Sequence, residues 1–429
     1  MTRVLINELT EKVGQKVTVA GWVSVRRDQG KLVFFEIRDR SGSVQTVVLP
    51  KSPALEVAKE IRSEYVVSIT GQVNKRPEKN INSDTQNGDI ELEVTNIEIL
   101  SKAELPFELG AEVNLDTYLD HQPYTLRSQH SKDVFKVQAS IVEAFREFLR
   151  REDFVEFQAP ALVGSDAEGG AAAFKVDYYY DKKAFLATSP QLYKQIMVGA
   201  YERAFATPKI FRGEKHATTR HLSEYSSLDF EMGFISDHTD VMAVVEKTIR
   251  HIVEKTENMA PVEKSLMTDA FPVLKLREAQ KILCVSDVEP DLEPEHERAI
   301  CEWARKEKNS DFVFITHYPM SKRPFYTYED ENDPGYSKSF DILFRGLEIT
   351  TGGQRVHNYE ELVRRIMSRG LDPEKFSFYL EAFKVGLPPH GGSATGLERL
   401  TARLCNLANV KEATLFPRDM TRIDTRLSE

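Results

Sequence analysis

The amino-acid sequence predicts an α+β protein in which a small β-barrel precedes a larger domain, whose mainly antiparallel sheet is flanked by helices. The first observation is a series of short segments across 16–100 in which apolar and polar residues alternate. The second is that strand-like segments after residue 131 are seldom joined by a single crossover helix, which disfavours a doubly wound parallel sheet. With 429 residues, the chain is long enough for two or three domains.

The first region, residues 1–103, has the element order of a five-stranded barrel. Turn residues separate the strand-like runs KVTVAGWVSV, KLVFFEIRD, SVQTVVL, YVVSITGQV and DIELEVTNIEIL. One helical segment, SPALEVAKEIRSE, stands between the third and the fourth run. Five strands with a helix after the third is the order of a Greek-key barrel of the OB type.

The composition is that of an ordinary globular protein, with 41% hydrophobic and 29% charged residues. No apolar run approaches the roughly 20 residues needed to cross a bilayer, and the N-terminal stretch lacks the apolar core of a secretion signal. Three scattered cysteines fit a reducing compartment. We therefore expect a cytoplasmic protein with no membrane partner. The net charge of −10 argues against a nucleic-acid partner, but the acidic excess lies downstream of the barrel and leaves room for a local basic patch.

Weak periodicity and two prolines, Pro106 and Pro123, predict a linker or hinge over 104–130. The larger domain, 131–429, then opens with the segment SKDVFKVQASIVEAFREFLRRED, whose apolar residues recur at helical spacing. Ser131 is its expected N-cap.

The stretch FRGEKHATTRH, residues 211–221, places many charges between two strand-like segments. We expect one strand over 210–214 and another over 227–234, with Leu228, Phe230, Met232 and Phe234 on one face and Asp229 and Glu231 on the other. The connecting loop is too long to be a simple turn. Its arginines can bind phosphate oxygens through forked hydrogen bonds, Glu214 can accept from the amino group of a base, and Tyr225 can stack on one. The alternative is a solvated loop of ion pairs.

Arg399 falls in the first turn of a helix predicted within residues 394–407, behind the glycine-rich stretch PPHGGSATG. Leu397, Leu400 and Leu404 form the apolar stripe of that helix. A cation at this end opposes the helix dipole unless an anion is nearby. The alternative is a structural ion pair with Glu398 or another acid.

Asp341 and Glu348 lie seven residues apart in SFDILFRGLEITTGGQR, so they would face opposite ways on one unbroken strand. A turn or bulge near Gly346 could bring the two carboxylates together as a magnesium site, in which a nucleotide supplies the remaining ligands. Arg355 follows two glycines, where a backbone can approach a ligand closely.

Gln191 and Lys194 are three residues apart in TSPQLYKQ and would share one face of a helix, where both could contact one small ligand. The alternative is an ordinary helix start whose lysine extends to solvent.

Together these stretches resemble the class II aminoacyl-tRNA synthetases and, within them, the aspartyl-tRNA synthetases, over essentially the whole chain. FVEFQAP resembles the first class motif, FRGEKHATTRHLSEYSSLDFEM the second and GSATGLERL the third. The stretches EGGA, SPQLYKQ, RPFY, SFD, GGQR, GLPPHGG and LFPRD are similar to signatures of the aspartyl branch. The short interval between the second motif and Asp341 is typical of the archaeal and eukaryotic form.

The resemblance implies ATP-dependent ligation of L-aspartate to tRNA(Asp) through an aspartyl-adenylate, with Mg²⁺ as the metal. It implies that Arg212 binds the α-phosphate and stabilises charge there, and that Glu214 and Tyr225 contact adenine. The remaining ATP ligands it implies are Arg220, His221 and Arg399 at the outer phosphates, with Asp341, Glu348 and Thr351 at the metal. No protein nucleophile is needed, because fixed cations act by positioning and electrostatic stabilisation.

For the amino acid, the resemblance implies contacts from Glu168, Ser189, Gln191, Lys194, Arg212, Thr351 and Arg355. Lys194 and Arg355 would face the side-chain carboxylate, an arrangement that suits aspartate better than asparagine. An asparaginyl-tRNA synthetase is the nearest alternative, and a non-catalytic tRNA-binding relative or a free-standing amino-acid ligase are others. The stretches around Ser393–Thr395 and Thr350–Thr351 depart from the commoner family residues.

The resemblance also implies that the barrel reads the anticodon through Arg27, Phe34, Gln45 and Glu91. The adjacent aromatics Phe34 and Phe35 must face opposite sides of a strand, so one of them points outward. Ser24 is too small to exclude a third anticodon base by bulk, so we expect tRNA(Asn) to be charged as well, with a downstream amidotransferase as partner. A homodimer is implied, with Pro160 at its interface.

Overall fold

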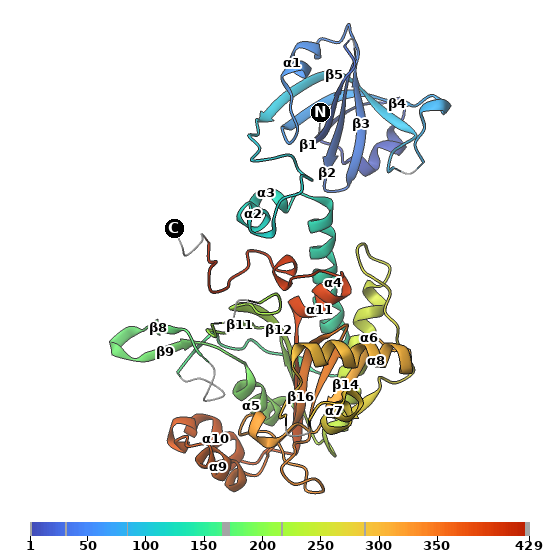
Figure 1. Ribbon diagram of the computed structural model, residues 1–429. Coiled ribbons are helices and arrows are strands. Elements are labelled where there is room, and N and C mark those ends of the chain that lie inside the picture. The colour runs from blue at the N-terminus through green and yellow to red at the C-terminus, as the bar shows by residue number, and fades with distance from the viewer. Residues whose placement is uncertain are drawn as a thin grey trace. The chain divides into compact units, whose positions relative to one another are not determined.

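A computed structural model describes residues 2–30, 32–83, 85–164, 172–215, 218–286 and 289–424. The chain divides into two compact units, Met1–Ala111 and Glu112–Glu429 (Figure 1). Each unit is built around a β-sheet of its own.

The first unit is a closed five-stranded barrel in the order β1-β2-β3-β5-β4. Its elements are β1 (Lys16–Asp28), β2 (Val33–Asp39), β3 (Gly42–Val48), α1 (Leu55–Glu60), β4 (Val66–Lys75) and β5 (Ile90–Ser101), preceded by the 3₁₀ helix Ile6–Lys12. Alternate strand residues such as Val19, Phe35, Ile37 and Ile69 fill the interior. The predicted order, five strands with a helix after the third, is confirmed.

The expected linker, 104–130, divides between the two units. Residues 104–111 belong to the barrel unit, and 112–130 belong to the second unit. There the chain forms two short helices, α2 (Leu115–Asp120) and α3 (Gln122–Thr125). The weak periodicity of the sequence reflects helices too short to show a repeated apolar face.

The second unit contains a nine-stranded sheet. Eight of its strands follow the order β13-β14-β15-β16-β17-β12-β10-β6, and the ninth, β11, pairs with β12 outside this order. Among the described strand pairs of this sheet, β13 with β14 and β10 with β6 are parallel and the rest are antiparallel, which confirms a mainly antiparallel sheet. The strands are β6 (Val155–Glu156), β10 (Arg203–Ala206), β11 (Lys209–Phe211), β12 (Glu224–Gly233), β13 (Val273–Lys275), β14 (Phe312–Thr316), β15 (Ser339–Phe344), β16 (Leu347–Arg355) and β17 (His390–Gly396).

Among the described residues of this unit, the helices of eight or more residues are α4 (Gln129–Arg151), α5 (Gln191–Tyr201), α6 (His238–Thr256), α7 (Leu276–Leu283), α8 (Pro294–Lys308), α9 (Tyr359–Ser368), α10 (Ser377–Lys384) and α11 (Leu397–Leu404). The largest core cluster joins α4, α6 and α11 to one face of the sheet through residues such as Phe145, Ile249 and Leu400. The expected N-cap of α4 is wrong by one turn, because Ser128, not Ser131, accepts from the backbone N–H of residue 131.

A smaller three-stranded sheet, β7-β9-β8, lies before α5 in the chain. It consists of β7 (Leu162–Val163), β8 (Lys175–Asp177) and β9 (Lys183–Leu186). Within the described part of the chain, no helix is long and apolar enough to cross a membrane, and the cysteines Cys284, Cys301 and Cys405 are unbridged.

Candidate active site

A cavity of about 520 Å³ lies on the face of the large sheet opposite its packed core. The alternation along β12 creates this division, because Leu228, Phe230 and Met232 are buried in the core while Ser227 and Asp229 line the cavity. The predicted faces are thus confirmed for these residues. Phe234 is the exception: the strand ends at Gly233, and Phe234 has φ +57° and is 72% exposed.

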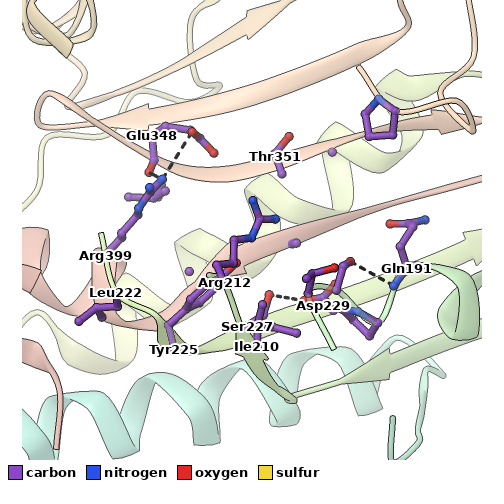
Figure 2. A pocket seen from close by; sticks show the side chains of 18 of the residues that line it. Gln191, Ile210, Arg212, Leu222, Tyr225, Ser227, Asp229, Glu348, Thr351 and Arg399 are labelled. Atoms are coloured by element: carbon purple, nitrogen blue, oxygen red, sulfur yellow. Dashed lines mark hydrogen bonds and ion pairs between the residues drawn. The ribbon is translucent and has the colours of Figure 1, made fainter. Parts of the chain in front are cut away.

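Most of the sequence-predicted residues line this one cavity. They are Ser189, Gln191, Lys194, Arg212, Glu214, Arg220, His221, Tyr225, Glu348, Thr351, Arg355 and Arg399. In Figure 2, Arg212 lies between two groups of side chains, with Arg399 and Glu348 on one side and Gln191 and Asp229 on the other. We call these two sides the arginine-rich end and the buried end.

The β11–β12 hairpin positions the residues at the centre of the cavity. Ile210 pairs with Tyr225 across the two strands, and the backbone N–H of Arg212 donates to the carbonyl of Ser223 at 2.8 Å. The paired strands are offset from the expected ones, since β11 ends at Phe211 and β12 already begins at Glu224. Arg212 and Glu214 therefore lie just beyond a strand end, held by one main-chain bond to the partner segment.

Two cations and two carboxylates form a network at the buried end. Lys194 Nζ lies 3.0 Å from Asp229 Oδ2 and 3.3 Å from Glu231 Oε2, and it donates to the carbonyl of Ser393 at 3.2 Å. Arg355 donates through Nε to Glu231 Oε1 at 3.0 Å and through a terminal nitrogen to the Gly392 carbonyl at 3.0 Å. All four side chains are almost fully buried.

Burial alone would raise the pKa of Glu231, but the neighbouring Arg355 and Lys194 hold that pKa below its usual range. Both cations therefore already have an acidic partner. Sequence reasoning placed Asp229 and Glu231 on the correct face of β12 but assigned them no role. Their signal was present, because two carboxylates alternating with three core residues must face a common site on the other side of the strand.

The backbone at the start of α5 presents Gln191. Its N–H donates to Ser189 Oγ at 3.1 Å, so Ser189 satisfies a main-chain donor of the first helical turn. Gln191 and Lys194 lie on the same helix and are both buried, so their predicted common face is confirmed, and Lys194 does not extend to solvent.

At the arginine-rich end, the cations also have acidic partners. Arg399 lies 3.5 Å from a carboxylate oxygen of Glu348 and donates to the Glu348 carbonyl at 3.0 Å. Arg220 donates to both oxygens of Glu297 on α8, at 2.8 and 2.6 Å. Glu297 was not predicted; it lies far from the quoted motifs and no sequence spacing indicates it. His221 Nδ1 lies 2.6 Å from the Thr218 hydroxyl.

The expected acid pair lies on the hairpin of β15 and β16. The turn at Arg345 and Gly346 has positive φ at both residues, and the register shifts after Ile342, so a turn and a bulge are both present. Asp341 is the cross-strand partner of Thr351. Partial removal from water raises the pKa of Glu348, whose side chain is still about one-third exposed. Arg399 opposes that rise and the charge of Asp341 adds to it, which indicates that the two carboxylates interact.

Arg323, from the RPFY stretch, adds a cation to this hairpin. It donates to Asp341 Oδ2 at 2.9 Å and to Thr351 Oγ1 at 3.3 Å, and its guanidinium lies over the Tyr318 ring. Asp341 Oδ1 is buried and has no hydrogen-bond partner among the described residues, which leaves one carboxylate oxygen available for a cation. Among the described residues, no group of three or more His, Cys, Asp or Glu could hold a metal ion by itself.

Asp341 is buried and is not among the residues that line the cavity. Glu168 lies outside the described residues. Pro160 is exposed, in the segment that follows β6.

The four predicted barrel residues share the outer face of neighbouring strands. Arg27 on β1 pairs with Phe34 on β2, and Gln45 on β3 donates to Glu91 on β5 at 3.4 Å. Phe35 is buried in the barrel while Phe34 is only half-buried, so Phe34 is the aromatic that points outward.

Comparison with known families matches both units. Residues 114–420 match the model described as tRNA synthetases class II (D, K and N). Residues 17–100 match the model of the OB-fold nucleic acid binding domain.

Relatives match along nearly the whole chain. The chain is 44% identical to the aspartate–tRNA(Asp/Asn) ligase of Thermus thermophilus over 98% of its own length and 99% of that protein. It is 40% identical to the protein of the same name from Deinococcus radiodurans, with 99% of each chain covered. Among solved structures, it is similar to asparaginyl-tRNA synthetase from Pyrococcus horikoshii complexed with asparaginyl-adenylate, with a TM-score of 0.90, 31% identity and 99% of both chains covered.

Proposed function

The chain belongs to the class II tRNA synthetases (D, K and N), and from this premise we propose that it joins L-aspartate to tRNA in two steps that use ATP. In the first step, an α-carboxylate oxygen of aspartate attacks the α-phosphorus of ATP, and pyrophosphate leaves. In the second step, a hydroxyl at the 3′ end of the tRNA attacks the carbonyl carbon of the aspartyl-adenylate, and AMP leaves. The near full-length relatives named as aspartate–tRNA(Asp/Asn) ligases support this reaction.

The position of Arg212 is the observation that carries the site assignment. It lies between the arginine-rich end and the buried end (Figure 2), where the carboxylate of one substrate would meet the α-phosphate of the other. A guanidinium there neutralises charge that develops on the phosphate oxygens, without any proton transfer. Arg220, His221 and Arg399 would bind the outer phosphates, and Glu214 and Tyr225 the adenine.

At the buried end, Gln191 and Ser189 would hold the amino group of aspartate, together with Glu168. Lys194 and Arg355 would hold its side-chain carboxylate. Because both cations already have acidic partners, an excess of positive charge does not explain a preference for aspartate over asparagine. Hydrogen-bond chemistry supports that preference instead, since lysine and arginine can only donate, and the amide nitrogen of asparagine, itself a donor, could not accept from Lys194 or Arg355.

Mg²⁺ fits the hairpin of β15 and β16 as a metal shared with the substrate. The open oxygen of Asp341 and the carboxylate of Glu348 would supply two hard ligands, with Thr351 beside them, and phosphate oxygens would complete the shell. When bound, the ion neutralises phosphate charge. Arg323 would keep Asp341 oriented through the bond to its other oxygen.

The barrel would bind the anticodon of the tRNA. Arg27, Phe34, Gln45 and Glu91 offer a cation, a stacking ring and polar groups on one outer face, the combination used for single-stranded bases. The family match of residues 17–100 to a nucleic-acid binding OB fold supports this assignment.

Aspartate-dependent exchange between pyrophosphate and ATP tests the site. We expect Arg212→Ala to reduce this exchange by roughly 10²-fold or more, as for the loss of one group that stabilises a transition state. Arg364→Ala is the matched control, because Arg364 lies on the exposed surface of α9 and pairs only with Glu361 among the contacts described. Normal exchange by Arg212→Ala would contradict the site.

We further propose that tRNA(Asn) is charged with aspartate as well as tRNA(Asp). Both of the relatives reported above carry the name tRNA(Asp/Asn), which supports this proposal, as does the small, half-buried Ser24, whose hydroxyl donates to the Glu36 carbonyl. The expected result is labelled Asp-tRNA formed from either purified tRNA. Such a product would require a downstream amidotransferase as partner. Failure to charge tRNA(Asn) would end this part of the proposal.

Activation of asparagine is the second candidate, favoured by the similarity to an asparaginyl-tRNA synthetase structure. Exchange measured with asparagine in place of aspartate separates the two. We expect exchange with aspartate alone.

We also propose that the chain forms a homodimer through the region of the exposed Pro160. Sedimentation of the purified chain should give twice the mass of 48.9 kDa. A monomer at micromolar concentration would contradict this proposal.

A further inference from the structure

Behind Gln191, a chain of buried side chains from three elements is linked by hydrogen bonds. Gln191 and Gln195 lie on α5, Tyr379 on α10 and His390 on β17. Gln191 Nε2 lies 3.0 Å from Gln195 Oε1, the Tyr379 hydroxyl lies 3.1 Å from the same oxygen, and Gln195 Nε2 lies 2.8 Å from His390 Nε2. Gln195 and His390 are completely buried. We call these four residues the α5 relay.

A main-chain carbonyl sets the direction of every bond in the relay. His390 Nδ1 lies 2.8 Å from the carbonyl of Pro388, and a carbonyl can only accept, so Nδ1 carries the proton. In a neutral imidazole, Nε2 then has a lone pair and accepts. Gln195 must therefore turn its amide NH₂ toward His390.

The same reasoning continues to the cavity. With its NH₂ directed at His390, Gln195 turns its oxygen toward Gln191 and Tyr379, and that oxygen accepts from both. Gln191 must then direct its own NH₂ at Gln195, which leaves the Gln191 oxygen facing away from the relay. Figure 2 shows this oxygen on the side of Gln191 that faces Arg212.

We propose that Gln195 is a positioning residue that holds the Gln191 amide with its oxygen toward the cavity and so makes the buried end select a protonated amino group. This inference rests on the proposed function, in which Gln191 holds the amino group of aspartate. In the opposite orientation, an NH₂ would face the ammonium group, and two donors would meet with no acceptor between them. Gln195 acts on the substrate only through Gln191.

The relay resists inversion because its far end is fixed. Turning Gln195 over would place its oxygen against the lone pair of His390 Nε2. Burial lowers the pKa of His390 to about 4, so the ring is neutral near pH 7. Glu231, Arg355 and His357 are among the charged or titratable groups around this ring.

Two variants and one substrate analogue test the inference. Gln195→Met keeps the length of the side chain but removes all three relay bonds of Gln195, and Tyr379→Phe removes a single hydroxyl. We expect Gln195→Met to raise the KM for aspartate in pyrophosphate exchange by roughly 10-fold or more, as for the loss of a hydrogen bond to a charged group, with kcat little changed. Tyr379→Phe should raise the KM for aspartate by a few-fold. It replaces Gln195→Met as the test variant if Gln195→Met does not fold.

Succinate separates positioning from general damage to the pocket, because it is aspartate with the amino group replaced by hydrogen. Its inhibition constant should be the same for the wild type and both variants. In a Gln191→Glu background, either terminal atom of residue 191 is an oxygen, so adding Gln195→Met should raise the KM for aspartate no further. These two results together would support the inference.

The inference is overturned if succinate binding weakens as much as aspartate binding, or if the KM for aspartate is unchanged in variants that fold. It is overturned as well if Gln195→Met raises the KM for aspartate by the same factor in the Gln191→Glu background as in the wild type. If the proposed function itself is wrong, the wild type will show no aspartate-dependent exchange. That result differs from each of the outcomes that overturn the inference about Gln195.

Discussion

The two ends of the cavity use ion pairs in different ways. At the buried end, Lys194, Asp229 and Glu231 are at most 1% exposed and form a network in which every charge has a partner. At the arginine-rich end, the side chains of Arg399 and Glu348 are 25% and 33% exposed, and Arg220 is held by Glu297 from another helix. Both ends carry matched charges, but at the arginine-rich end the Arg399–Glu348 pair is partly exposed, whereas Arg220 and Glu297 are 15% and 9% exposed.

This difference indicates which contacts are permanent. A buried ion pair is costly to break, because the remaining charge stays in a medium of low dielectric constant. A partly exposed pair can exchange one partner for another anion at little cost, since water screens both states. We therefore interpret the buried end as a preorganised template for one small substrate. The arginine-rich end is then a set of cations that leave protein carboxylates when phosphates arrive.

The largest expected effect is at the buried end. Lys194→Met should lower the free energy of unfolding by about 3–5 kcal/mol, because Asp229 and Glu231 lose a buried counter-charge. It should also abolish aspartate-dependent exchange. Urea titration of the folded chain measures the stability. Lys209→Met is the control, since Lys209 is 53% exposed and lies 3.9 Å from Glu224, and it should cost less than about 1 kcal/mol. Equal effects of the two substitutions would show that the buried network around Lys194 contributes no more to stability than an exposed ion pair does.

A pH-dependent effect is expected at Glu398, beside Arg399. This carboxyl is 4% exposed, and burial raises its pKa to about 7. The folded state then binds more protons than the unfolded state between pH 4.5 and 7, so this group contributes stability below pH 4.5 that is lost as the pH rises through 7.

Glu398→Gln should remove this part of the pH dependence, which amounts to at most about 3 kcal/mol. Unfolding by urea at several pH values between 4.5 and 8 measures it. Glu302→Gln, at an exposed position of α8, should follow the wild-type curve. Parallel curves for the wild type and Glu398→Gln would show that Glu398 does not titrate in this interval.

The smallest effect on stability is expected at Glu297. Glu297→Gln keeps a hydrogen-bond acceptor for Arg220 and should change the free energy of unfolding by only about 1 kcal/mol. Because Arg220 would no longer have to leave a carboxylate, the KM for ATP should fall a few-fold. The exposed Glu302 on the same helix again supplies the control, as Glu302→Gln. A higher KM for ATP would show instead that Glu297 orients Arg220 for phosphate.

The sequence was most informative where local patterns repeat. The barrel strands and the hairpin of β15 and β16 agree with their predicted positions because alternation and turn residues act over a few neighbouring residues. Boundaries were less well predicted. Phe234 continues the apolar alternation of β12 but lies beyond the end of the strand, and Ser131 is a good capping residue that lies one turn inside α4. Local composition does not reveal which of two suitable residues ends an element.

The sequence by itself determined the two-part architecture, the cations and carboxylates of the site, and the family to which they point. Only the tertiary structure decided the partners: Glu297 for Arg220, Arg323 for Asp341, and Asp229 and Glu231 for Lys194. The physical reason is that residue type and spacing specify what a side chain can do, whereas the partner of a charge depends on which distant segments meet when the sheet closes. The α5 relay is the clearest case, because the orientation of one glutamine depends on a carbonyl nearly two hundred residues further along the chain.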